Sequence, residues 1–399
     1  MSDSAATGSR ISHFRESTAS QSDHRGAREQ LIPWWDAERL ERARVVMAGV
    51  GAIGNELLKG LALVGIGRII VIDFDTVSPS NLSRSVLFRD EDVGKPKAVV
   101  AARRAKELNP GITVIPVHGD LRRDLALSTL RDADVVLGGL DNIEARFTLN
   151  RRVRIAGATY IDSGISDAQA QVSRFHPEGG ACYECNFTEN MRRRFTERYS
   201  CTGLVRRIPD RTVPTTIVGA SVAAALQLQD ALRFLHDAQT GLRPGQRLSV
   251  LFDNHRQVLD DLPENPDCLA HAPRAVADLT LADSPHTLTP ALLAAAAGTP
   301  EASVSLGFDI VERFSCPACG TESPICRPAA QVYEDEAPCP NCGRERQVWG
   351  ASEAGPDSPA WNLPLATLGV TARELLRVGP RWVEIGGPDP WLGEGASDQ

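Results

Sequence analysis

The sequence predicts an α/β fold with a doubly wound, mostly parallel sheet, added antiparallel strands and a small C-terminal region. Short runs rich in Val and Ile alternate with helical patterns over the first 140 residues. That order is typical of a parallel sheet covered by helices on both faces. Two cysteine pairs in the last third of the chain have the spacing of a metal-stapled β-ribbon, which small regions use in place of a large core.

The elements of the sheet follow from the period of the apolar residues. Strands are expected at residues 43–49, 67–75, 112–119 and 133–141. Helices are expected at residues 50–66, 95–110 and 125–132. A first strand that ends in a glycine-rich turn and continues into a helix is typical of a Rossmann-like sheet.

The rest of the chain divides into further parts. Residues 153–176 are expected to add strands to the sheet, and residues 213–236 to form a long apolar helix against it. After about residue 275 the composition changes to an alanine-rich piece, a cysteine cluster and a Pro/Gly/Ser linker at 350–360. We therefore expect a flexible lead at 1–24, a main domain at 25–275 and a separate C-terminal zinc-ribbon and partner-docking region at 276–399.

Composition and charge argue against several classes of protein. The formal net charge of −8 disfavours a general nucleic-acid binder, which usually carries a net basic domain. The Ser-rich N-terminus lacks the apolar core of a secretory signal, and no stretch is long and apolar enough to span a bilayer. Nine cysteines, several in C-x-x-C pairs, favour metal sites in a reducing compartment. We expect a cytoplasmic protein with no membrane and no nucleic-acid partner.

A glycine-rich motif predicts a nucleotide site. GVGAIG at 49–54 fits G-x-G-x-x-G, in which Gly49 and Gly51 let the backbone approach a phosphate and Gly54 completes the pattern. Asp73 lies 19 residues beyond Gly54, at the end of the second strand, where a carboxylate can bind ribose hydroxyls. These features alone leave an NAD-dependent dehydrogenase open.

Four polar residues farther along favour a triphosphate. Asn81, Arg84 and Lys97 follow the ribose carboxylate, and Asp141 comes at the end of another strand. Cleavage of a triphosphate needs cationic donors and a metal-holding carboxylate near its phosphates, whereas a nicotinamide site does not. Each residue taken singly is equally well explained as a solvated loop charge, but the set favours ATP.

The chain resembles the ubiquitin-activating-type adenylating enzymes, a family that includes the bacterial ThiF and MoeB proteins. The resemblance spans roughly residues 25–275 and rests on G-x-G-x-x-G, D-x-D-x-V-x-x-S-N-L-x-R, D-V-G-x-P-K and L-D-N-x-x-x-R. It implies ATP with Mg²⁺ on Asp141, and a homodimer in which Arg28, or alternatively Arg25, reaches the partner's nucleotide. The remaining nucleotide contacts that it implies are Gly49, Gly51, Gly54, Asp73, Asp75, Asn81, Arg84, Lys97 and Asn142.

Two groups of residues have the spacing of zinc ligands. Cys182 and Cys185 form one x₂ pair, and Cys268 and His271 form a second; the family resemblance implies that such pairs close one zinc site. The alternative is a buried cysteine pair with two loop residues. CPACG and CPNCG predict a structural zinc ribbon with Cys326 outside it. The ribbon ligands are Cys316, Cys319, Cys339 and Cys342.

Cys201 stands apart from both groups. Arg198, Arg206 and Arg207 surround it and would favour its thiolate. The resemblance implies a catalytic cysteine at this place, shortly after the first zinc pair and directly before a threonine, here Thr202. The alternative is an ordinary buried thiol.

These observations lead to one expected activity and its rivals. We expect adenylation of the C-terminal glycine of a ubiquitin-like β-grasp protein, then a thioester on Cys201 that passes to a conjugating enzyme. The first alternative is a sulfur-carrier protein adenylyltransferase of the MoeB or ThiF type. The second is a catalytically silent scaffold that binds a ubiquitin-like protein.

Overall fold

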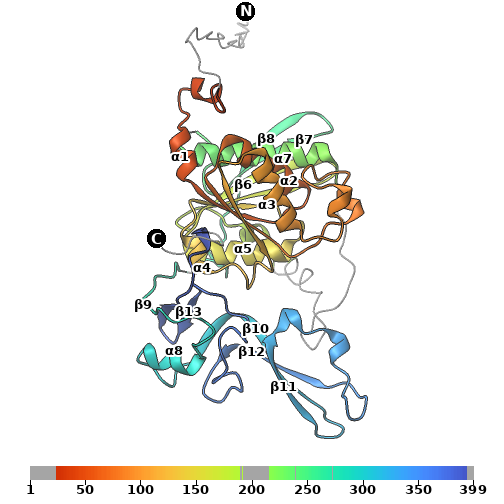
Figure 1. Cartoon of the computed structure of the whole chain (residues 1–399), viewed down its shortest axis with the longest axis vertical. Coiled ribbons are helices and arrows are strands. Elements are labelled where there is room, and N and C mark those ends of the chain that lie inside the picture. The colour runs from red at the N-terminus through yellow and green to blue at the C-terminus, as the bar shows by residue number, and fades with distance from the viewer. Residues whose placement is uncertain (1–23, 189–190, 192–214, 239, 272, 393–399) are drawn as a thin grey trace, which may run out of the picture.

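The computed structural model describes residues 24–188, 191, 215–238, 240–271 and 273–392 (Figure 1). Two sheets organise this part of the chain. The larger has eight strands in the order β3-β2-β1-β4-β5-β6-β7-β8; the first five are parallel and the last three are antiparallel. Its strands are β1 (Arg44–Ala48), β2 (Arg68–Asp73), β3 (Thr113–His118), β4 (Val135–Gly138), β5 (Tyr160–Ile165), β6 (Gln169–Phe175), β7 (Gln246–Leu251) and β8 (Arg256–Asp261).

Helices cover both faces of this sheet, as Figure 1 shows. Val45 and Met47 of β1 point into a core shared with α2 (Ala52–Val64), α3 (Lys97–Leu108) and α7 (Ile217–Leu235). Val46 and Ala48 point into the opposite core, with α4 (Leu127–Arg131) and α5 (Ile143–Ala156). This alternation follows from the two-residue period of a strand, and it explains why β1, β2 and β4 contain continuous apolar runs. The predicted fold class is confirmed.

The sequence analysis did not predict helix α1 (Ala37–Arg42), helix α5 or the β7–β8 hairpin of the sheet domain. Helix α5 was missed because three arginines on its buried positions break the apolar period: Arg146, Arg152 and Arg154 are each no more than 8% exposed. The β7–β8 hairpin was missed because its outer strand is largely polar and half-exposed. Periodicity detects buried apolar faces, so inward-facing polar residues escape it.

The second sheet belongs to the C-terminal part of the chain. Its strands pair in the order β11-β10-β13-β14-β9, with β12 also paired to β10. The linker expected at 350–360 is wrong in its first half, because Gly350 and Ala351 pair with β10 as part of β12. The elements of this part are β9 (Leu279–Thr280), α8 (Pro290–Ala296), β10 (Val304–Ser315), β11 (Glu322–Pro328), β12 (Gln347–Ala354), β13 (Leu375–Val378) and β14 (Arg381–Glu384).

Apolar and polar contacts join the two parts. Leu375 and the fully buried Trp391 belong to the same core as Val46 of β1. Arg68 at the start of β2 donates a hydrogen bond of 2.7 Å from Nη1 to the carbonyl oxygen of Trp391. The C-terminal part therefore completes the core under one face of the large sheet.

Among the described helices, none combines the length and the apolar character that crossing a bilayer would require.

Replacing Trp391 by alanine should lower the free energy of unfolding by about 3 to 5 kcal/mol, because the change leaves a large cavity in a closed core. Trp349, which is 47% exposed, provides the matched control, since Trp349→Ala removes the same side chain from the surface. Denaturant unfolding followed by circular dichroism measures both. Equal losses in the two variants would contradict the placement of Trp391.

Candidate functional site

A cavity of about 520 Å³ opens at the carboxyl ends of the parallel strands. The strand order reverses between β1 and β4, and ligands of open α/β sheets bind in the crevice at such a point. Every residue predicted to contact the nucleotide lines this cavity except Gly54, which lies just behind its glycine turn. The predicted residues in the lining are Gly49, Gly51, Asp73, Asp75, Asn81, Arg84, Lys97, Asp141 and Asn142.

The turn after β1 has no room for a side chain at Gly49 or Gly54, whereas a Cβ on Gly51 would meet nothing within 4 Å. Gly49 has φ of +90°, and a Cβ on it would lie 2.7 Å from the carbonyl oxygen of Gly139. A Cβ on Gly54 would lie 2.1 Å from the carbonyl oxygen of Gly49. Helix α2 begins directly after Gly51, and no side chain caps its N-terminus. The first N–H groups of the helix therefore remain available to a ligand in the cavity. A helix N-terminus of this kind binds phosphate.

Asp73, the last residue of β2, fixes the two loops that frame the cavity. Its Oδ2 accepts a hydrogen bond of 2.7 Å from the Val50 N–H, and its Oδ1 accepts one of 2.8 Å from the Asp75 N–H. Burial raises the pKa of this carboxyl, while the nearby charge of Lys97 and the two N–H donors oppose that rise. The side chain thus orients the glycine turn and also lines the cavity where it can meet a sugar.

The cationic and amide side chains come from the segment after β2. Lys97, the first residue of α3, is 8% exposed, and its Nζ donates a hydrogen bond of 2.7 Å to Asp75 Oδ2. Arg84 donates to the carbonyl oxygen of Ser80, and Asn81 Oδ1 accepts from the Ser78 N–H at 3.0 Å. These groups are therefore held in place by local partners.

Asp141 and Asn142 follow β4 on the other side of the reversal point. Asn142 caps α5, because its Oδ1 accepts a hydrogen bond of 2.7 Å from the Ala145 N–H. Its Nδ2 donates to Asp141 Oδ1 at 3.3 Å. Asp141 is exposed, and no ion pair to it occurs among the described residues. An exposed carboxylate without a cationic partner among the described residues, at the mouth of a nucleotide-sized cavity, suits a hydrated Mg²⁺ ion.

Four charged residues of the cavity wall were missed by the sequence analysis: Asp120, Arg122, Glu144 and Arg146. Arg122 donates from Nε to Asp120 at 3.0 Å and from Nη1 to Glu144 at 3.2 Å. Arg146 donates to Asp162 Oδ2 at 2.5 Å and also to the carbonyl oxygen of Leu140. The signal that could have found Asp120 and Arg122 is their place just after β3, since the carboxyl ends of parallel strands converge. For Arg146 that signal was the last letter of L-D-N-x-x-x-R.

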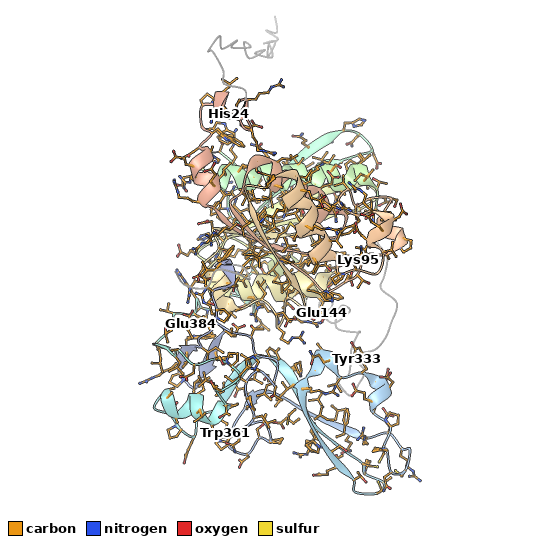
Figure 2. All side chains as sticks on the ribbon, viewed as in Figure 1. His24, Lys95, Glu144, Tyr333, Trp361 and Glu384 are labelled. Carbon is orange, nitrogen blue, oxygen red and sulfur yellow. The ribbon has the colours of Figure 1, made fainter. Side chains whose placement is uncertain are left out.

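The two candidate N-terminal arginines lie away from this cavity. Arg25 and Arg28 are exposed, neither lines the cavity, and Figure 2 places the adjacent His24 far from Glu144 on the cavity wall. A side chain that serves a partner's site need not line its own. The role of Arg28 or Arg25 in a homodimer stays a prediction.

The first cysteine group converges on one point. Cys182 Sγ lies 3.7 Å from Cys185 Sγ and 3.8 Å from Cys268 Sγ, and Cys185 Sγ lies 3.2 Å from His271 Nε2. Zn–S bonds of about 2.3 Å in a tetrahedron place sulfur atoms about 3.8 Å apart, so the four side chains fit a zinc ion. Cys201, which follows the pair Cys182 and Cys185 in the sequence, lies outside the described residues.

The second cysteine group has the same fit. Cys316 and Cys342 Sγ are 3.5 Å apart, Cys319 and Cys339 Sγ are 3.7 Å apart, and all four sulfurs lie within 4.8 Å of one another. Each cysteine pair closes a tight turn through a glycine with φ of +72°, Gly320 or Gly343. The N–H of that glycine donates to the carbonyl oxygen of the first cysteine of the pair. Cys326 lies outside the group, as expected.

The chain should bind two zinc ions, which native mass spectrometry of the purified protein can count. Cys316→Ser should reduce the count to one, because three remaining ligands hold the ion weakly. Cys326→Ser is the matched control and should keep both ions. One ion in the wild-type protein, or a loss in the control, would contradict the ligand sets.

Comparison with known proteins agrees with this geometry. A match to the ThiF family covers residues 26–270. The chain is 31% identical over 232 residues to the SAMP-activating enzyme E1 of Haloferax volcanii, covering 58% of this chain and 80% of that protein. It is 39% identical over 155 residues to the sulfur carrier protein adenylyltransferase of Thermus thermophilus, covering 38% of this chain and 57% of that protein. This match spans little more than half the length of the Thermus relative.

A solved structure with the same arrangement is the crystal structure of E. coli MccB with ATP. It superposes with a TM-score of 0.53 and 27% sequence identity, over 63% of this chain and 75% of MccB. The family match takes in the glycine turn, Asp73, the cations of the cavity and the three cysteines of the first group, and it ends one residue before His271. The chain belongs to the ThiF family.

Proposed function

We propose that this protein uses ATP to adenylate the C-terminal carboxylate of a small sulfur-carrier or ubiquitin-like protein. The observation that carries the proposal is the single cavity that gathers the glycine turn, Asp73, Lys97 and Asp141. A dehydrogenase would need the turn and the ribose carboxylate but not the other two groups.

The relatives support a carrier-protein substrate. The Thermus and Haloferax proteins are named for the activation of a sulfur carrier and of SAMP, and MccB was crystallised with ATP. A molybdopterin-synthase adenylyltransferase of Salmonella typhimurium is also 36% identical over 149 residues. These names favour sulfur-carrier activation over protein conjugation, so we place it first.

The reaction needs positioning more than proton transfer. A carboxylate oxygen of the carrier forms a bond to the α-phosphorus of ATP, and the bond from that phosphorus to the bridging oxygen of pyrophosphate breaks. No proton moves, because the carboxylate is already ionised. The α2 N-terminus and Asp73 would hold the phosphates and the ribose in line for this displacement.

Charge on the departing pyrophosphate is the second requirement. Lys97 and Arg84 line the same cavity and would neutralise that charge, exchanging their present partners Asp75 and Ser80 for phosphate oxygens. Asp141 would hold a Mg²⁺ ion, which supplies further charge neutralisation when it is bound.

A second step at Cys201 is the alternative that distinguishes conjugation from sulfur transfer. Its support is the segment SCTGL, which follows the first cysteine pair and has arginines on both sides. Attack of the thiolate sulfur on the acyl carbon would release AMP and leave a thioester, which a conjugating enzyme could accept.

Lys97→Met and Asp141→Asn should each lower ATP–pyrophosphate exchange by about 100-fold or more, because each removes charge stabilisation at the leaving group. The assay contains the protein, ATP, Mg²⁺ and a small β-grasp carrier protein ending in glycine. Lys95→Met is the matched control, since Lys95 lies outside the cavity lining and pairs with Asp92 at 3.7 Å.

Exchange that survives in Lys97→Met, or falls equally in Lys95→Met, would contradict the assignment of the cavity. A wild-type protein that binds the carrier but never exchanges pyrophosphate would instead support the scaffold alternative.

Cys201→Ala should retain exchange, because the adenylation step does not use the thiol. If the protein also forms a thioester, non-reducing mass spectrometry of the wild type should detect a carrier adduct that reductant removes and that Cys201→Ala lacks. Thiocarboxylate formation on the carrier without any such adduct would favour the sulfur-transfer branch. Loss of exchange in Cys201→Ala would contradict the division into two steps.

A further inference from the structure

The C-terminal part reaches back to the wall of the nucleotide cavity. The match to the ThiF family ends at residue 270, yet Glu374 lies 5% exposed against the loop between β3 and α4. Its Oε1 accepts a hydrogen bond of 2.9 Å from the Leu127 N–H, the first residue of α4. Its Oε2 accepts one of 2.8 Å from Arg152 Nη2.

Arg152 extends this contact toward the cavity. The side chain is 7% exposed on the buried face of α5. Its Nη2 also donates to the carbonyl oxygen of Leu125 at 2.6 Å, and its Nη1 donates to that of Arg122 at 3.2 Å. One buried guanidinium therefore binds the loop backbone at two points and is itself held by Glu374.

The loop in question, residues 119–127, forms part of the cavity. Its residues 119–122 are in the lining, and the Arg122 side chain bridges Asp120 on the loop to Glu144 on α5. Thr371 Oγ1 adds a hydrogen bond of 3.2 Å to the carbonyl oxygen of Arg123. The C-terminal segment 371–374 thus holds the loop at its middle and at its C-terminal end.

We propose that the C-terminal part is a component of the nucleotide site, with Glu374 as a positioning residue that holds the cavity loop 119–127 through Arg152 and the Leu127 N–H. The proposal rests on the proposed function for the identity of the ligand, ATP. Glu374 touches no part of the cavity itself, so its effect passes through the loop and Arg122.

The effect should be on ATP affinity. The Arg122 guanidinium already donates hydrogen bonds to Asp120 and Glu144. The loop therefore acts on ATP by shaping the cavity wall and not by supplying a free positive charge. Removing the charge of Glu374 leaves the buried Arg152 guanidinium without its anionic partner. We expect Arg152 to shift, and the loop backbone that it binds to shift with it. Loosening this wall weakens binding of the ligand in its ground state.

Glu384 provides a matched control at the same junction, where Figure 2 shows it. It is 9% exposed and binds Arg131 at 2.8 and 3.1 Å, at the far end of α4 from Leu127. Glu374→Gln and Glu384→Gln make the same chemical change in the same interface, but only the first touches the cavity loop.

The test uses the full chain and two measurements on each variant: amide hydrogen exchange of the peptide spanning 119–128, and the Kd of ATP with Mg²⁺ by calorimetry. Glu374→Gln should accelerate exchange in this peptide at least fivefold and raise the Kd of ATP about tenfold. Glu384→Gln should leave both within twofold of the wild type, even if its thermal stability falls as far. Arg152→Lys keeps the positive charge but loses the several N–H donors of the guanidinium. Its exchange rate and its Kd of ATP should lie between those of the two Gln variants.

Equal exchange of the 119–128 peptide in the two Gln variants would overturn the inference, whether or not ATP binds. An unchanged Kd in Glu374→Gln with a loosened loop would overturn it as well. If Glu374→Gln does not fold, Arg152→Lys is compared with Glu384→Gln in its place. The inference then requires faster exchange of the 119–128 peptide and a higher Kd of ATP in Arg152→Lys. Failure of the wild-type chain to bind ATP at all would instead overturn the proposed function, while the exchange data would still report on the loop.

Discussion

The close approach of two backbone turns at the point where the sheet reverses is the constraint on which the site depends. Gly49 and Gly54 meet each other and Gly139 at distances that exclude any Cβ on the first two. This approach brings the α2 N-terminus beside the end of β4. Asp73 after β2 and Asp141 after β4 therefore line the same cavity. Asp73 then locks the turn by accepting from the Val50 N–H. Nucleotide binding is thus a property of backbone geometry first and of charged side chains second.

Helix α5 ties the remaining features to that cavity. Its N-terminus is capped by Asn142 at the cavity mouth. Farther along, Asn150 accepts from the Tyr183 N–H and donates to Glu184 and to Cys182 Sγ, so the same helix holds the first cysteine group. Arg152 on its buried face meets the C-terminal part. One helix therefore contacts the cavity, the first cysteine group and the C-terminal part.

The sequence sufficed for the parts of the molecule that local patterns encode. The parallel sheet, the glycine turn and the pairs within each cysteine group were predicted because each depends on apolar period or on spacing within a few residues. That Cys182 and Cys185 meet Cys268 and His271, more than 80 residues away, was implied by the family resemblance. Helix α5 was missed because inward-facing arginines hide its apolar face, and the predicted linker at 350–360 begins inside β12 because small residues there pair with β10. The contact between Glu374 and Arg152 joins residues 222 positions apart, and no single-sequence signal encodes such a pairing.

The most direct test of the central claim follows oxygen through the reaction. A glycine-ending carrier protein labelled with heavy oxygen in its terminal carboxylate is incubated with this protein, ATP and Mg²⁺, and a thiol acceptor then takes the acyl group. Attack on the α-phosphorus predicts that the released AMP carries the label, because the acyl carbon parts from that oxygen in the second step. Label in inorganic phosphate with ADP as the other product, or no label in any nucleotide, would contradict the account.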